Sequence, residues 1–179
     1  MSDMTPDRGT DHMERVKGGR RVSATEPAET PMDGLFFGVV AMLPLLAGGI
    51  GLFVLPDNWS FLTLNLTLFW GAAILCFLAG VRRGVSFRQP GGPKVTQIAM
   101  MLFLFIAGYG AIVATVWAFP RLAIGLELAG YLALAILDPL SARAGRAPLY
   151  FASFRPWQMA IPLVSLLLVG AYVLTSPFF

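Results

Sequence analysis

Five long apolar stretches dominate this chain and leave few folds open to it. Each approaches the length of about 20 residues that an α-helix needs to cross a hydrocarbon core of about 30 Å. Backbone polar groups cannot stay unpaired in lipid, and the stretches lack the alternating pattern of barrel strands. We therefore expect an all-α integral membrane bundle of five transmembrane helices, at residues 35–55, 61–81, 97–118, 122–137 and 157–175.

Composition agrees with this class. The chain of 179 residues is 56% hydrophobic and only 13% charged, whereas soluble domains carry about 25% charged residues. Residues 1–34 differ from the rest, because they hold seven acidic and five basic side chains and show no apolar periodicity. They fit neither a secretory signal nor a mitochondrial transit peptide, so we expect a disordered tail.

The Lys and Arg residues gather in alternate polar segments. The stretches separate six polar segments, which are the tail, four connections and the carboxyl-terminal end. Counted in this order, the segments hold five, none, four, one, three and none of the Lys and Arg residues. Cytoplasmic loops carry an excess of Lys and Arg, so we expect a cytoplasmic amino terminus and a periplasmic carboxyl terminus. A four-span alternative without residues 122–137 would leave Arg121 in a re-entrant turn, and five spans are simpler.

Several kinds of chemistry lack their essential residues. His12 is the only histidine and lies in the tail, and Cys76 is the only cysteine. Histidine-liganded metals within the membrane, a Ser–His dyad and disulfides are therefore excluded. We expect no catalytic site, metal, cofactor or nucleic-acid partner, and we expect Cys76 to pack as a small hydrophobic side chain.

Glu127 is the one ionisable residue clearly inside a stretch. An acid there costs about 2–3 kcal/mol unless it is paired or protonated. Tyr131 follows it by one helical turn, on the same face. Counting the helical rise places other groups near this depth, so we predict an intramembrane polar cluster of Glu127, Tyr131, Tyr109 and Asn65. The cluster has two interpretations, a structural clamp that sets helix register and a proton or cation relay, of which the clamp is favoured.

The same count of helical rise predicts an ion pair at the cytoplasmic rim. Arg82 and Arg83 close the second stretch, and Asp138 closes the fourth, which runs in the same direction. Their side chains should therefore lie level with one another, and we expect an Arg–Asp pair there.

Small residues predict where helices approach most closely. In lipid, Gly and Ala allow close van der Waals packing between helices. The second and third stretches should form the tightest pair, through Gly71, Gly80, Gly84, Gly108 and Ala111. Pro44 and Pro162 lie inside the first and fifth stretches and should bend them.

Residues 70–84, WGAAILCFLAGVRRG, resemble the central segment of a family of small polytopic membrane proteins. That family is known only as a domain of unknown function, and its members include bacterial inner-membrane proteins and a mitochondrial transmembrane relative. A second similarity lies at residues 148–157, where Tyr150, Phe151 and Arg155 match an aromatic pair and an arginine before the last helix. The resemblance covers about residues 35–175.

The chain departs from this family pattern at three positions. Cys76 stands where Ser is usual, Ala79 where Gly is usual and Arg83 where Trp is usual. The first two keep small side chains, whereas the third replaces an aromatic ring by a charge. The resemblance implies the topology and a bacterial inner-membrane location, and it implies no activity.

These observations favour a non-enzymatic accessory, assembly or scaffolding protein whose partners are the lipid bilayer and a larger membrane complex or a second copy. The alternative is a small oligomeric transporter or proton-coupled permease centred on Glu127. A third hypothesis, an enzyme acting on lipid headgroups, would use Arg82, Arg83, Asp138, Arg143, Arg146 and Arg155. Those basic residues are better explained as determinants of topology.

Overall fold

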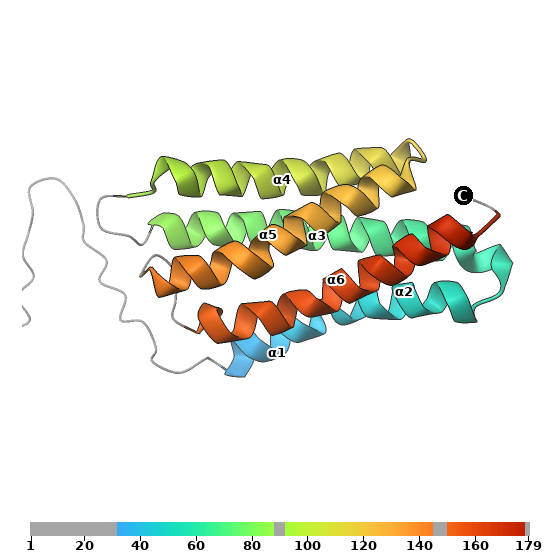
Figure 1. The fold of residues 1–179 in the computed structure, drawn as a ribbon, viewed down its shortest axis with the longest axis horizontal. Helices are drawn as coiled ribbons and strands as arrows, with labels where there is room; N and C mark the ends of the chain where they lie inside the picture. The colour runs from blue at the N-terminus through green and yellow to red at the C-terminus, as the bar shows by residue number, and fades with distance from the viewer. Residues whose placement is uncertain (1–31, 88–91, 145–149, 178–179) are drawn as a thin grey trace, which may run out of the picture.

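A computed structural model of the chain describes residues 32–87, 92–144 and 150–177 (Figure 1). Every regular element in these ranges is a helix. The predicted tail falls outside them, except that the first helix begins at Met32. The helices are α1 (Met32–Val40), α2 (Leu43–Val54), α3 (Ser60–Phe87), α4 (Val95–Val116), α5 (Pro120–Arg143) and α6 (Phe151–Thr175), with a short 3-10 helix, η1 (Asp57–Trp59).

Five helical segments are long and apolar enough to cross a membrane, and they match the five predicted stretches. α1 and α2 together form the first. The predicted all-α membrane bundle is therefore confirmed as a fold class. Three boundaries differ from the prediction by a full six residues: α3 continues to Phe87, α5 continues to Arg143 and α6 already begins at Phe151. Hydropathy ends a stretch at its first charge, whereas a helix continues while its backbone hydrogen bonds can form.

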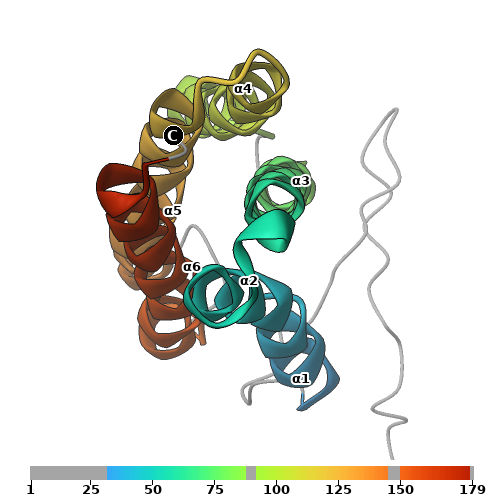
Figure 2. The same cartoon turned by 90° about the vertical axis from the view of Figure 1, so that its right-hand side faces the viewer.

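Successive spans run antiparallel, as short connections require. α3 packs most extensively against α4, and α5 packs most extensively against α6. α2 contacts both α3 and α6, and α4 contacts both α3 and α5, so the helices enclose a common core (Figure 2).

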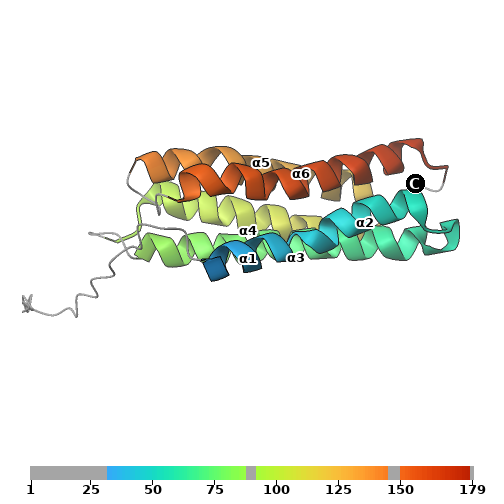
Figure 3. The same cartoon turned by 90° about the horizontal axis from the view of Figure 1, so that it is seen from below.

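α3 and α5 end, and α4 and α6 begin, at one end of the bundle (Figure 3). Five of the six Lys and Arg residues within the described ranges lie toward this end, and Arg121 lies at the other. We call it the basic end, and its five members are Arg82, Arg83, Lys94, Arg143 and Arg155.

The first span is interrupted near Pro44. Proline lacks an N–H, and its ring clashes with the carbonyl of the residue four positions earlier, which is Val40. α1 ends at Val40, and a turn at residues 41–42 leads into α2. The predicted bend at Pro44 is thus a break between two helices, whereas α6 stays helical through Pro162.

The break leaves backbone carbonyls without their helical hydrogen bonds, and side chains from neighbouring spans donate hydrogen bonds to two of these carbonyls. The Leu45 N–H would bond the Ala41 carbonyl in a continuous helix, but here it bonds the Met42 carbonyl. The Trp70 indole N–H on α3 donates to the Ala41 carbonyl at 2.8 Å, and the Gln158 amide on α6 donates to the Gly38 carbonyl at 2.9 Å. Such bonds re-satisfy the backbone that a proline frees inside a membrane.

The turn between α4 and α5 is very tight. Ala118 has φ of 58°, in the left-handed region, and the Phe119 N–H bonds the Ala114 carbonyl at 2.8 Å. The Ala118 N–H bonds the Thr115 carbonyl at 3.1 Å, which completes a Schellman cap. Pro120 then opens α5 with a backbone angle suited to a first helical position. This turn lets the short fourth stretch begin directly after the third.

Candidate functional site

Glu127 on α5 is fully buried, with 0% of its surface exposed. Neither carboxyl oxygen has a hydrogen-bond partner among the described residues. The carboxyl lies directly against Gly71 of α3, where even a methyl group would overlap Oε2, and Leu45 of α2 borders the same space. Three helices therefore enclose this group. The two ion pairs of the described residues do not involve it, so nothing there offsets the cost of a buried charge.

Tyr131, one turn along α5, is also 0% exposed. Its hydroxyl donates to the Gly71 carbonyl at 2.7 Å. Gly71 thus provides space for Glu127 and an acceptor for Tyr131, so two side chains of α5 contact one residue of α3. Hydrogen bonds between membrane helices contribute about 0.6 to 2 kcal/mol, which suits a clamp that sets the register of two helices.

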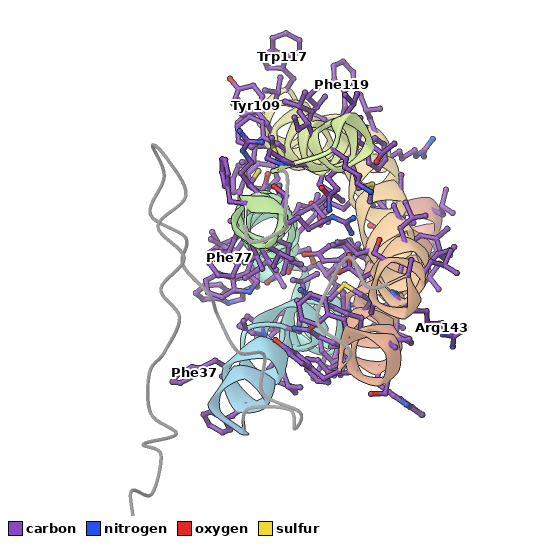
Figure 4. The ribbon with its side chains drawn as sticks, turned by 90° about the vertical axis from the view of Figure 1, so that its left-hand side faces the viewer. Phe37, Phe77, Tyr109, Trp117, Phe119 and Arg143 are labelled. Atoms are coloured by element: carbon purple, nitrogen blue, oxygen red, sulfur yellow. The ribbon has the colours of Figure 1, made fainter. Side chains whose placement is uncertain are left out.

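Two predicted members of this cluster lie elsewhere. Tyr109 is 58% exposed on the outer surface of α4, where its ring stacks on Phe105 (Figure 4). The Asn65 amide donates to the Phe61 carbonyl of its own helix at 2.7 Å. Of the four residues predicted to form the cluster, only Glu127 and Tyr131 therefore lie together. Counting rise gives the depth of a residue, whereas its face depends on rotation about the helix axis.

Asp138 forms the centre of a second polar layer, toward the basic end. It is buried on α5 and pairs with Arg82 of α3, as the sequence predicts. Its other oxygen lies 3.1 Å from Nε of Arg155 on α6. Arg83 takes no part in this layer, because its guanidinium lies 4.3 Å from the ring centroid of Phe87. The prediction is therefore wrong for Arg83, and the ion pair is formed by Arg82 and Asp138.

Arg155 is absent from the predicted ion pair, because the sequence places it in the polar segment before residue 157. In the structure α6 begins at Phe151 and carries Arg155 on its inner face. Only 5% of its side chain is exposed. Its guanidinium donates to the Gln158 side chain at 2.9 Å and lies 4.3 Å from the centroid of the Phe151 ring. A single arginine close before an apolar stretch is the signal that could have placed it at the level of Asp138.

The second layer links most of the bundle. Arg82, Asp138, Arg155 and Gln158 connect α3, α5 and α6, and the Gln158 bond to the Gly38 carbonyl extends the network to α1. Buried ion pairs and charge-assisted hydrogen bonds of this kind need exact partners, because each group would be costly to bury alone. The layer therefore holds the spans in a defined relative position.

A small cavity of about 20 Å³ opens beside this network. Such a volume has room for about one water molecule. Its lining comes from α3, α4, α5 and α6 and includes Arg82, Ser86, Gln97, Asp138, Ser141 and Phe151. Within residues 32–87, 92–144 and 150–177, no three His, Cys, Asp or Glu side chains gather as a metal site requires.

The predicted small residues divide into three groups. Gly108 of α4 lies so close to α3 that a methyl group there would be 2.9 Å from the Ala72 carbonyl oxygen, and Ala111 is fully buried. Gly71 packs against Glu127 of α5 and Leu45 of α2, not in the predicted contact with α4. Gly80 and Gly84 are different, because a methyl group at either would meet nothing within 4 Å. No atom of α4 lies within 4 Å of such a methyl group, so their predicted role in the α3–α4 contact is wrong.

Cys76 supports the same close contact between α3 and α4. A methyl group on Gly108 would lie 2.7 Å from its sulfur, and the thiol points to the Phe105 carbonyl at 3.9 Å. The cysteine thus packs as a small side chain between the two helices.

Comparison of the chain with models of protein families, with curated proteins and with solved structures finds no match. The family resemblance of residues 70–84 therefore stays a prediction.

Proposed function

We propose that this protein is a non-catalytic accessory or assembly protein that docks on a larger membrane complex through the surface of α3. We also propose that it resides in the bacterial inner membrane with its amino terminus in the cytoplasm. Its membrane-spanning helices and short connections support a role carried out within the bilayer. The distribution of Lys and Arg supports the orientation.

The interior favours an accessory role over transport. A permease centred on Glu127 needs a water-accessible route to that carboxyl. Glu127 is fully enclosed by Gly71, Leu45 and its own helix, and the cavity beside Asp138 does not include it. From Glu127 to Asp138 is eleven residues, or about 16 Å along the helix.

The open notch at Gly80 and Gly84 carries the proposal. These glycines lie one turn apart on the surface of α3, and a methyl group at either would meet nothing within 4 Å. Small residues at this spacing let a second helix approach closely, and the gain in van der Waals contact drives association in lipid. Among the described residues of one copy this feature has no packing role, which is why it points to a partner.

A pull-down in mild detergent tests the docking surface. The variant Gly80→Ile/Gly84→Ile should lose a co-purifying membrane protein that the wild-type chain retains. Gly125→Ile is the matched control, because Gly125 on α5 also has nothing within 4 Å of an added methyl group. Equal retention by both variants, or recovery of the wild-type chain alone, would contradict the proposal.

One observation favours the alternative of a proton-coupled permease, namely that the Glu127 carboxyl is buried without a partner. Buried ionisable groups within spans often mark proton paths. Glu127→Gln keeps the size of the side chain and removes the exchangeable acid proton. Intact folding with loss of proton-linked transport in proteoliposomes would favour the permease, whereas unchanged behaviour would leave Glu127 as a structural residue.

A further inference from the structure

Positive charge exceeds negative charge around the cavity at the basic end. Arg82 and Arg155 share the single carboxylate of Asp138, which leaves this buried group with one net positive charge. Lys94 and Arg143 lie at the same end of the bundle and add to the potential. Among the side chains that the structure describes there, Asp138 is the only acid. A buried cation in excess is costly unless an anion approaches it.

The lining of the cavity also offers neutral donors. The Gln97 side-chain oxygen accepts a bond from the Lys94 N–H at 2.9 Å, which leaves its amide NH₂ for another partner. The Ser141 hydroxyl lines the same space from α5. Gln97 lies in the first turn of α4, where the helix dipole favours negative charge. Asp138 lines the cavity too, but its charge is already offset by two arginines.

The position of the cavity suits a lipid headgroup. A hydrocarbon core of about 30 Å corresponds to about 20 helical residues. Counted along α3 from Phe61, this length ends close to Val81, so Arg82 and Ser86 lie at the level of the phosphate groups. Arg82 is 13% exposed, which leaves the cavity open toward that level.

We propose that this cavity, between Arg82, Gln97 and Ser141, binds one oxygen of a phosphate group carried by an anionic phospholipid or by a free anion. Its volume of about 20 Å³ admits one oxygen-sized atom. The rest of the phosphate then stays at the membrane surface, where the charges of the basic end attract it. A phospholipid phosphate is already held at this depth, which makes it the better supplied source.

Binding is tested with the full chain in nanodiscs of phosphatidylcholine. Phosphatidylglycerol is added in one arm and inorganic phosphate in the other, and both the melting temperature and the lipid retained in native mass spectra are measured. We expect phosphatidylglycerol to raise the melting temperature and to be retained preferentially. An equal rise with inorganic phosphate would identify a free anion as the ligand of the same site. No response in either arm would overturn the proposal.

Variants locate the binding to the cavity. Arg82→Gln should weaken retention of phosphatidylglycerol on the order of fivefold, the effect of one basic residue near a membrane surface. Arg143→Gln is the matched control, because it removes the same charge from an exposed position that does not line the cavity.

Gln97→Glu covers the case in which Arg82→Gln does not fold. A glutamate keeps the cap bond to the Lys94 N–H and leaves the Asp138 ion pairs intact, but it places a negative charge in the cavity. It should reduce retention at least as much as Arg82→Gln. Full retention in Gln97→Glu, or equal losses in Gln97→Glu and Arg143→Gln, would show that the cavity is not the site.

Discussion

Gly71 controls how closely α3 and α5 approach at the polar core. Its missing side chain makes room for the Glu127 carboxyl, and its carbonyl accepts the Tyr131 hydroxyl. A glycine in a helix interior has a conformational cost, but here the close approach requires it. The role of Gly71 is therefore steric, and it can be tested against a glycine of the same helix that is free of contacts.

We predict that Gly71→Ala lowers the free energy of unfolding by about 1–3 kcal/mol, as overpacking of a filled core does. Gly80→Ala is the control, because a methyl group at Gly80 meets nothing within 4 Å. The control should be neutral or slightly stabilising, since Ala favours helix more than Gly does. Melting temperatures of the purified variants in detergent measure both effects, and similar values for the two would contradict the steric role.

Asp138 is the residue on which the second polar layer depends. We predict that Asp138→Asn destabilises the fold by about 3–5 kcal/mol, because it leaves Arg82 and Arg155 buried without their shared carboxylate. Arg83→Met is the control, since Arg83 takes no part in the two ion pairs of this layer and stacks over the Phe87 ring, and such a contact contributes about 0.5–1 kcal/mol. Thermal unfolding followed by fluorescence-detected size exclusion compares them. If Asp138→Asn were as stable as Arg83→Met, the second polar layer would not contribute to the stability of the fold.

At the scale of elements, the two irregular points of the bundle are handled differently. At Pro44 the chain breaks a helix, and Trp70 and Gln158 from other spans bond the carbonyls that are released. At the α4–α5 turn no other span contributes a bond to the cap, which is closed by local hydrogen bonds around Ala118. The first point therefore depends on tertiary contacts, whereas the second depends on local backbone conformation.

Ala118 adopts a left-handed conformation that costs a non-glycine residue about 1–2 kcal/mol. We predict that Ala118→Gly stabilises the protein by about 0.5–1 kcal/mol after the extra entropy of an unfolded glycine is subtracted. Ala129→Gly, at an exposed position inside α5, should have the opposite sign and destabilise by about 0.5–1 kcal/mol. Melting temperatures of the two variants, measured side by side, decide the matter, and destabilisation by Ala118→Gly would refute the prediction.

At the scale of the whole molecule, the two ends of the bundle differ in the side chains that they carry. Five of the six described Lys and Arg residues lie toward one end, and exposed aromatic side chains such as Trp117 and Phe119 lie at the other, between α4 and α5. This asymmetry is the basis of the proposed orientation.

Reporter fusions test that orientation. Alkaline phosphatase fused after the last residue should be active, because we place the carboxyl terminus outside the cytoplasm. The same enzyme fused between α5 and α6 should be inactive, and green fluorescent protein should show the reverse pattern. Active phosphatase at the α5–α6 connection together with inactive phosphatase at the carboxyl terminus would invert the topology.

The sequence was sufficient to predict those features of the fold that depend on position along the helix axis. The length and apolar character of the stretches determined the five spans, the alternation of Lys and Arg determined which helix ends lie together, and helical rise placed Arg82 level with Asp138. These are properties of position along the helix axis, which the bilayer constrains directly.

Rotation about the helix axis was decided only by tertiary structure. It turned Arg155 inward and Tyr109 outward, stacked Arg83 on Phe87 away from Asp138, and left Gly80 and Gly84 on the surface. In a soluble protein the apolar face identifies the inside. In this chain both faces of a span are apolar, because lipid is as apolar as the core. Which face turns inward therefore depends on packing and on pairs such as Arg155–Asp138, whose partners come from different helices.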